Sequence, residues 1–427
     1  MQVFKDPAKN TWSQLTQRPQ LELEFLESSV KNILNRVKKS GDQALRELTL
    51  QFDKVSIQDL RVSETEISEA ETMLSENLKN AIQTAAANIS KFHSTQKKDS
   101  SAVETMPGVN CWRKSVPIRS VGIYIPGGSA PLFSTVLMLG TPARLAGCQQ
   151  IILCSPPDQK GKINPAILFA ARLVGITQIF KVGGAQAIAA LAYGTETIPN
   201  VHKIFGPGNQ YVTKAKQLVT EDSVAIDMPA GPSEVLVFAD DSAVPRFVAA
   251  DLLSQAEHGE DSQVMLVLKN ESMLNSVQAE IKKQLDQLPR KSIAEKSLNN
   301  SRVVIFRSEE EAIEFINEYA PEHLILNLKN FDVVAEKIFN AGSVFLGNYS
   351  PEAVGDYASG TNHTLPTNGF AKAYAGVSLE SFMKYITFQR LTEIGIKNLG
   401  PVVEEMAEAE QLAGHKMAVR VRLESLG

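Results

Sequence analysis

An acid and a histidine stand side by side in the segment "APEHLIL", residues 320–326. Glu322 and His323 follow Pro321, which would end the helix predicted by "EEAIEFINEYA", and they precede an apolar run typical of a buried strand. A carboxylate and an imidazole so placed can move protons at one reacting carbon. The same pair can also be a solvated helix-to-strand junction, so the rest of the sequence has to decide.

Histidines gather in polar, turn-rich parts of the chain. Four of the six lie in segments rich in Gly, Pro, Asp and Glu. In "SQAEHGEDS", Gln255 and His258 are three residues apart, so a continuing helix would place them about 60° apart, where both could bind one ion. His258 could instead stabilise the helix end, because a cation there interacts favourably with the dipole.

Two further segments carry an acid and a histidine. The loop "GDYASGTNHTLPT" holds Asp356 and His363 among small residues that allow close approach to a ligand, although a surface turn would have the same composition. Glu410 and His415 are five residues apart, about 140° around a helix, so they could serve one point only if the helix ends or lies along a cleft wall. Otherwise the pair belongs to an exposed helix face.

These segments together contain a possible metal-ligand set without a thiolate. Its nitrogen and oxygen donors would suit Zn²⁺, Mn²⁺ or Co²⁺. The members are Gln255, His258, Asp356 and His415. The local pattern alone does not bring residues so far apart in the chain together.

The surrounding sequence predicts an α/β protein. The first hundred residues have helical periodicity, and from Ser120 short β-branched runs alternate with helical segments. A Pro- and Gly-containing break at residues 226–234 separates this series from a second one, and the chain is helical again from about Ala371. We therefore expect two lobes with mostly parallel sheets, N-terminal helices and a small helical tail, with ligands outside the carboxyl ends of the strands.

Nucleotide-binding signals are incomplete. "GPGNQY", residues 206–211, follows a predicted strand and opens a helix but lacks the third glycine of GxGxxG, and "PGGSAPL" after "VGIYI" lacks it too. Either could bind phosphate or be an ordinary turn. P-loop, GxSxG and HExxH motifs are absent from the sequence.

Composition excludes several classes of protein. The 427 residues carry a net charge of −5 without a long basic block, so we expect no nucleic-acid partner. The most apolar stretch is short and contains Arg172, so we expect no membrane span. Three cysteines without CxxC spacing indicate neither disulfides nor a thiolate metal site, which favours a cytoplasmic protein.

Many of these segments, in the same order, resemble histidinol dehydrogenase over nearly the whole chain. They are "VGIYIPGGSAPLFSTVLMLGTPA", "VGGAQAIAALAYGTE", "KIFGPGN", "IDMPAGPSEVLV", "DLLSQAEHG", "PEHLIL", "AGSVFLG" and "GDYASGTNHTLPT". The resemblance implies a zinc-dependent enzyme that oxidises L-histidinol through histidinal to L-histidine with two NAD⁺ in turn. It also implies a homodimer of two incomplete Rossmann-like lobes per chain, whose helical tail reaches the other subunit and completes a shared active site.

The resemblance assigns roles to individual residues. One zinc ion per subunit would be bound by Gln255, His258, Asp356 and His415, the last from the other subunit. Substrate contacts fall on Ser233, His323, His363 and Glu410 besides the metal ligands, and NAD contacts fall on Tyr124, Gln186 and Asn209. Gly414 departs from the family, in which alanine precedes the zinc histidine.

A mechanism follows from what each step requires. We expect His323 to take the hydroxyl proton of the alcohol, and Glu322 to deprotonate the water that hydrates the aldehyde. The metal would orient the substrate rather than generate hydroxide. For the domains we expect an arm at residues 1–20 that packs with the tail, a first lobe from residues 21–120 and 233–375, a second, NAD-binding lobe from residues 121–232, and a dimer-swapped tail at residues 376–427.

Three alternatives compete with this hypothesis. Cys111 or Cys148 could form a thiohemiacetal, as in aldehyde dehydrogenases, although Cys148 is also a simple buried small residue. A two-lobed α/β protein could bind an amino acid without catalysis. A zinc hydrolase would need an open metal site and an oxyanion-binding group.

Overall fold

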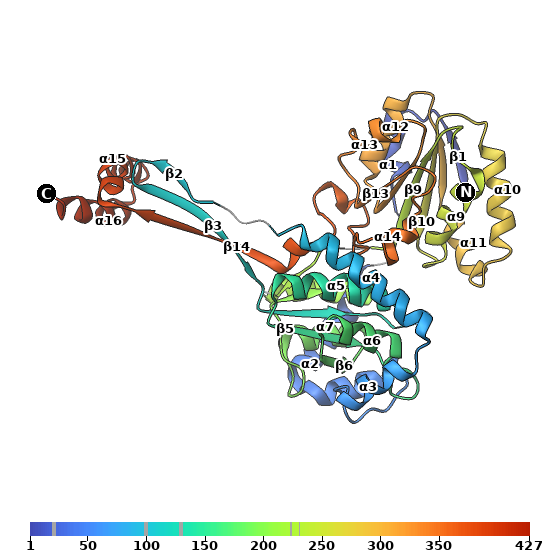
Figure 1. The fold of residues 1–427 in the computed structure, drawn as a ribbon, viewed down its shortest axis with the longest axis horizontal. Helices are drawn as coiled ribbons and strands as arrows, with labels where there is room; N and C mark the ends of the chain where they lie inside the picture. The colour runs from blue at the N-terminus through green and yellow to red at the C-terminus, as the bar shows by residue number, and fades with distance from the viewer. Residues whose placement is uncertain (19–22, 98–100, 128–130, 223, 230) are drawn as a thin grey trace.

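Two α/β lobes and a long arm make up the molecule (Figure 1). The computed structural model describes residues 1–18, 23–97, 101–127, 131–222, 224–229 and 231–427. Within these residues, no helix is both long and apolar enough to span a membrane. The expected fold class, two lobes with mostly parallel sheets plus N-terminal helices and a helical tail, is confirmed.

The first lobe is built on a six-stranded parallel sheet in the order β1-β11-β10-β9-β12-β13. The strands are β1 (Gln2–Lys5), β9 (Glu234–Ala239), β10 (Gln263–Leu268), β11 (Arg302–Ile305), β12 (His323–Asn327) and β13 (Ser343–Leu346). The helices are α1 (Trp12–Leu15), α9 (Pro245–Ala256), α10 (Leu274–Leu285), α11 (Lys291–Asn299), α12 (Glu309–Tyr319), α13 (Phe331–Ala335) and α14 (Glu352–Tyr357). Strands β9, β10 and β12 are buried along their whole length, as a parallel sheet covered on both faces requires.

The second lobe has a five-stranded parallel sheet in the order β6-β5-β4-β7-β8. Its strands are β4 (Ser120–Tyr124), β5 (Gln150–Ser155), β6 (Gln178–Lys181), β7 (Lys203–Phe205) and β8 (Ala225–Ile226). Its helices are α2 (Leu23–Phe52), α3 (Glu64–Thr72), α4 (Glu76–Ser94), α5 (Phe133–Ala146), α6 (Pro165–Leu173), α7 (Gly184–Tyr193) and α8 (Gln210–Val219). Helix α2 is kinked at Gly41, whose φ of 46° and ψ of −129° interrupt the helical conformation.

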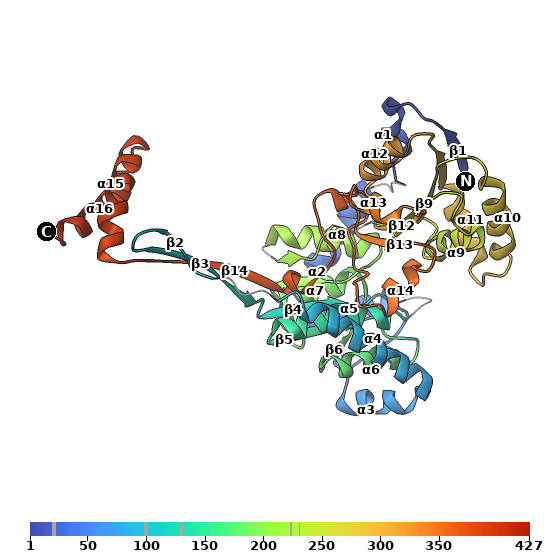
Figure 2. The same cartoon turned by 45° about the horizontal axis from the view of Figure 1, so that its top comes forward.

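The arm projects from the second lobe and ends in the C-terminal helices, away from both sheets (Figures 1 and 2). It is an antiparallel sheet of β2 (Val103–Met106), β3 (Val109–Pro117) and β14 (Met383–Leu391), followed by α15 (Glu393–Ala409) and α16 (Ala413–Glu424). Four 3₁₀ turns complete the described elements: η1 (Lys9–Thr11), η2 (Thr220–Asp222), η3 (Phe370–Lys372) and η4 (Leu379–Phe382). Large apolar side chains remain exposed on the arm, among them Ile386, Ile394 and Met406.

Two predicted domain assignments are wrong. Helix α2 packs on α7 and α8, α3 packs on α6, and α4 packs on α5. The described residues between 23 and 120 therefore belong mostly to the second lobe and the arm rather than to the first lobe. The described part of the predicted arm, residues 1–18, does not pack with the tail, because β1 pairs with β11 and Trp12 and Leu15 are buried in the first lobe. Helical periodicity indicates that one face is buried but not which sheet buries it.

Candidate active site

The junction at residues 320–326 has the predicted structure. Helix α12 ends at Tyr319, and Ala320 adopts a left-handed conformation with a φ of 51°. Strand β12 begins at His323, so the acid and the histidine occupy the very start of the strand. An alanine rarely adopts this conformation, and such local strain is concentrated at functional sites. Both side chains are buried, with 5% of Glu322 and 2% of His323 exposed.

The pair lies at the amino edge of the first sheet, so the prediction of a ligand site outside the carboxyl ends of the strands is wrong for it. His323 pairs with Val235, near the start of β9, and with Ser343, the first residue of β13. Helix α9 runs back from the far end of β9 and brings Gln255 to this edge, where the Gln255 amide nitrogen lies 3.3 Å from His323 Nδ1. Helix α14 likewise brings Asp356.

His323 is held from both ring nitrogens. Its Nδ1 lies 3.2 Å from the backbone oxygen of Glu234, and its Nε2 lies 3.1 Å from Asp356 Oδ1. A carbonyl oxygen and an ionised carboxylate can both only accept, so in this arrangement each ring nitrogen carries a proton. Burial lowers the pKa of His323, but the carboxylates of Glu322 and Asp356 outweigh it and raise that pKa well above its usual value.

Glu322 is a buried carboxylate with an increased proton affinity. Its Oε2 accepts a hydrogen bond of 2.9 Å from the backbone N–H of Glu234 and lies 3.5 Å from His323 Nδ1. Burial raises the pKa of Glu322, although His323 and this backbone hydrogen bond oppose the shift. A carboxylate with a raised pKa is a better general base than an exposed one.

A polar cluster surrounds His323. Burial by itself would raise the pKa of Asp356, but its hydrogen bond to His323 and the charges of neighbouring imidazoles lower that pKa, so Asp356 is ionised. The Nδ1 of His363 donates a hydrogen bond of 2.8 Å to the backbone oxygen of Asp356. His258 is open to solvent on one side, yet desolvation by surrounding protein atoms lowers its pKa despite the nearby Asp356. His258 can therefore offer a neutral nitrogen.

The cluster also joins the two lobes. The Nε2 of His363 lies 3.0 Å from the hydroxyl of Thr135, which belongs to α5 of the second lobe. One residue earlier, the side-chain amide of Asn362 donates a hydrogen bond of 2.6 Å to the backbone oxygen of Met138, which also lies on α5. The site therefore lies where the first lobe meets the second.

Three of the four expected zinc ligands have the chemistry that a metal ion requires. Gln255 is 1% exposed and its Oε1 has no hydrogen-bond partner among the described residues, which is an unfavourable state for a buried oxygen unless a ligand occupies it. With the ionised Asp356 and the neutral His258 it supplies the oxygen and nitrogen donors that Zn²⁺ accepts. Among the described residues no group of three His, Cys, Asp or Glu side chains is arranged to hold a metal.

Glu410 and His415 lie outside the cluster. Helix α15 ends at Ala409 and α16 begins at Ala413, so one continuous helix does not carry both residues. The angle of about 140° that a single helix would impose between them therefore does not apply. Both are exposed at the end of the arm, far from the lobes of the same chain (Figures 1 and 2). Gly414 lies beside open space, since a Cβ added to it would meet no atom within 4 Å.

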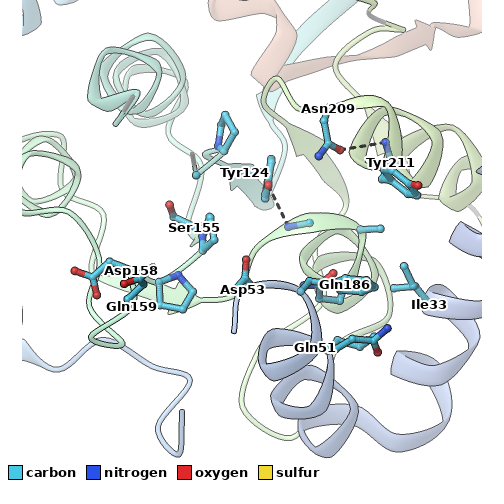
Figure 3. A pocket seen from close by; sticks show the side chains of 18 of the residues that line it. Ile33, Gln51, Asp53, Tyr124, Ser155, Asp158, Gln159, Gln186, Asn209 and Tyr211 are labelled. Carbon is cyan, nitrogen blue, oxygen red and sulfur yellow. Dashed lines mark hydrogen bonds between the residues drawn. The ribbon is translucent and has the colours of Figure 1, made fainter. Parts of the chain in front are cut away.

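The three expected NAD contacts line one cavity of about 970 Å³ in the second lobe (Figure 3). Tyr124 ends β4, Gln186 lies in the first turn of α7, and Asn209 caps α8 by accepting from the N–H groups of Tyr211 and Val212. The phenol oxygen of Tyr124 accepts a 3.1 Å hydrogen bond from Gly184. This cavity does lie at the carboxyl ends of its strands, as predicted.

Sequence reasoning missed the residue that supports Glu322 and His323. Glu234 contacts Glu322 and His323 through its backbone, and Arg18 holds its carboxylate with two hydrogen bonds of 2.7 and 3.2 Å. The phenol of Tyr319 and the backbone of Asn368 also donate to it. One signal in the sequence could have found Glu234, because it is an acid beside the expected substrate residue Ser233 at the start of an apolar run. An acid that is buried with such a run needs a cation as its partner.

The cysteines give no support to a thiohemiacetal route. Cys111 lies on β3 of the arm, and Cys148 follows α5, where burial raises the pKa of its thiol to about 12. A reactive cysteine requires a lowered pKa.

Comparisons with known proteins agree on one family. The family model for histidinol dehydrogenase matches residues 16–423. A histidinol dehydrogenase of Bacteroides thetaiotaomicron is 58% identical over 426 residues and covers 100% of both chains, and one of Yersinia pestis is 52% identical over 405 residues, 94% of this chain and 90% of its own. The crystal structure of histidinol dehydrogenase from Elizabethkingia anophelis is 58% identical, has a TM-score of 0.98, and the match covers 100% of this chain and 98% of that chain. The resemblance inferred from the motifs is confirmed.

Replacing Arg18 by alanine should destabilise the first lobe by about 3–5 kcal/mol, because it leaves the buried Glu234 carboxylate without its cation. Urea unfolding followed by circular dichroism measures the change. Arg307→Ala is the matched control, since Arg307 is 92% exposed and pairs with Asp6 at the surface. Equal midpoints for the two variants would contradict a supporting role for the Arg18–Glu234 pair.

Proposed function

This chain belongs to the histidinol dehydrogenase family, and on that premise we propose that it oxidises L-histidinol through L-histidinal to L-histidine with two NAD⁺ in turn. The observation that carries the proposal is the buried Glu322–His323 pair beside a cluster of Gln255, Asp356 and His363 at the meeting point of the lobes. The pair can move protons, and the cluster can hold a polar substrate next to it.

One zinc ion per subunit is part of the proposal. Bound zinc would supply a fixed positive charge that orients the amine and imidazole of the substrate. Gln255, His258 and Asp356 would hold it, and His415 of a second subunit would complete the set. The support is the unpartnered Gln255 oxygen, the neutral His258 and the ionised Asp356. The substrate-binding role of Ser233, His323, His363 and Glu410 belongs to the same proposal.

His323 would act first, as the base for the alcohol. Its Nδ1 is fixed by the backbone oxygen of Glu234, so Nε2 faces the cluster and can take the hydroxyl proton while hydride leaves carbon. Without a metal, the carboxylates of Glu322 and Asp356 raise the pKa of His323. A zinc ion bound to Asp356 would share the negative charge of that carboxylate and lower the pKa of His323 toward the neutral form that a base requires.

Glu322 would act second, on the water that hydrates the aldehyde. Burial gives it a raised pKa, and the Glu234 N–H holds one of its oxygens in place. His323 would then take the hydroxyl proton of the hydrate, as it did from the alcohol. The adjacent residues thus serve consecutive steps at one carbon, and each hydride passes to NAD⁺ bound by Tyr124, Gln186 and Asn209 in the second lobe.

A homodimer is required by this arrangement. Glu410 and His415 are exposed at the tip of an arm that leads away from the cluster of their own chain, and α16 has no buried residue. A second copy would receive this tip and supply its own in return, which is the reciprocal contact of a two-fold dimer. A cytoplasmic location completes the proposal, since all three cysteines are free thiols.

An absorbance assay tests the function directly. Purified protein with zinc, L-histidinol and NAD⁺ should form two NADH per histidinol consumed, and prior removal of zinc with a chelator should abolish the reaction until zinc is restored. Dinucleotide or histidinol binding without NADH formation would favour the non-catalytic alternative. Hydrolysis of an ester or amide without NADH formation would favour the hydrolase.

Glu322→Gln should separate the two half-reactions. The amide keeps the shape of the side chain but cannot accept a proton, so oxidation of L-histidinal should fall by about 10²- to 10⁴-fold while oxidation of L-histidinol to the aldehyde is largely retained. Single-turnover measurements with each substrate provide the comparison. Equal loss of both half-reactions would contradict the division of roles between Glu322 and His323.

Mixed dimers test the shared site. His258→Ala and His415→Ala should each be inactive, but subunits mixed after dissociation should recover about a quarter of wild-type activity, since half the dimers are mixed and each of these has one intact site. A mixture of His258→Ala with Asp356→Asn is the control. Both residues belong to the part of the site that one subunit supplies, so no mixed dimer of these two variants has an intact site. Recovery in the control, or none in the test mixture, would argue against sharing.

A further inference from the structure

Two buried polar atoms in the cavity of the second lobe lack partners. Gln186 is 1% exposed, and its Nε2 has no hydrogen-bond partner among the described residues. The Oδ2 of Asp53 is also buried without a partner. Both residues line the cavity that contains Tyr124 and Asn209 (Figure 3). One atom is a hydrogen-bond donor and the other an acceptor, so a ligand group that both accepts and donates would complement them.

Asp53 is placed there by the end of α2. Its backbone N–H donates a hydrogen bond of 2.9 Å to the backbone oxygen of Thr49, which closes the last turn of the helix. The nearby cations are engaged elsewhere, because Arg36 pairs with Glu47 and Lys162 pairs with Glu66. Burial raises the pKa of Asp53 to about 6. Above that pH the chain therefore holds a partly desolvated negative charge without compensation, which disfavours folding.

A hydroxyl group would satisfy both atoms. It can accept from Gln186 Nε2 and donate to Asp53 Oδ2, whereas a phosphate offers only acceptors and would be repelled by the carboxylate. The ribose of a dinucleotide presents two neighbouring hydroxyls. In many dinucleotide-binding folds an acid at the end of the second strand binds the ribose 2′-hydroxyl. Here the acid comes from a helix that precedes the sheet, so that fingerprint does not reveal it.

The position of Asp53 selects the adenosine ribose. The cavity wall that contains Pro131 leads into α5, whose Thr135 contacts His363 of the active site. The cavity is also lined by residues of α2, which packs on α7 and α8 in the second lobe. The nicotinamide has to reach the active site, so the other end of the molecule lies nearer to α2.

We propose that Asp53 binds the adenosine ribose hydroxyls of the dinucleotide and makes the enzyme select NAD⁺ over NADP⁺. This inference rests on the proposed function, which requires a dinucleotide in this cavity. The 2′-phosphate of NADP⁺ would place an anion against the Asp53 carboxylate. The residue therefore contributes to affinity for one cofactor and to exclusion of the other.

Calorimetric titration of the full chain at pH 8 with NAD⁺ and NADP⁺, without substrate, tests the proposal. Asp53→Asn should weaken NAD⁺ binding about tenfold, which is the effect of losing one charged hydrogen bond. The dissociation constant for NADP⁺ divided by that for NAD⁺ should become smaller than in wild type. The KM for NAD⁺ should rise in parallel. Asp59→Asn is the matched control, an exposed acid six residues later that does not line this cavity and should leave both constants unchanged.

Thermal unfolding distinguishes ligand binding from a structural role. Removing the uncompensated charge should leave the unfolding midpoint of Asp53→Asn at pH 8 equal to or above that of wild type. A lowered midpoint together with weaker binding would overturn the proposal, as would unchanged binding of both dinucleotides. A wild type that binds NAD⁺ through Asp53 but forms no NADH from histidinol would refute the proposed function and support this inference. A wild type that binds neither dinucleotide would refute both.

Discussion

The parallel pairing of β9 with β12 is the constraint on which the candidate active site depends. It sets His323 opposite Val235 and thereby places the backbone of Glu234 against both members of the pair. The Glu234 N–H holds Glu322, and its carbonyl oxygen holds His323. Arg18 and Tyr319 fix the Glu234 side chain from two other segments. A shift of this strand by one residue would reverse which side chains face the core, so the whole arrangement follows from one register.

The same burial acts in opposite directions on neighbouring groups. Desolvation favours the neutral form, so it raises the pKa of Glu322 and lowers that of His363. Asp356 stays ionised because imidazoles surround it. The cluster thus contains an acid with high proton affinity, an ionised acid, and two imidazoles, His323 and His363, whose pKa values are shifted in opposite directions. Such divergence lets one site take up protons at one residue and hold a cation at another.

Local patterns in the sequence were sufficient for part of the structure. Alternating β-branched and helical segments predicted both parallel sheets, and Pro321 before an apolar run predicted the junction that carries Glu322 and His323. The family resemblance supplied the grouping of Gln255, Asp356 and His363, which their local patterns left open. Long-range choices could not be predicted, since the partner of α2 and the 216-residue separation of Arg18 from Glu234 leave no trace in local periodicity. The expectation that ligands lie at carboxyl edges failed for the first lobe because α9 and α14 return their side chains to the amino edge.

The two lobes contribute different edges of their sheets to one reaction. The first lobe uses its amino edge for the polar cluster, and the second uses its carboxyl edge for the cavity of Tyr124 and Gln186. The hydrogen bond between His363 and Thr135 joins them, so a change in the angle between the lobes would move the cavity relative to His323. The exposed tip of the arm lies away from the cluster of its own chain, so the proposed function depends on a second copy as well. In the proposed function neither a single lobe nor a single chain contains every group that the chemistry requires, so the contact between the lobes and the proposed contact between subunits would both be parts of the catalytic site.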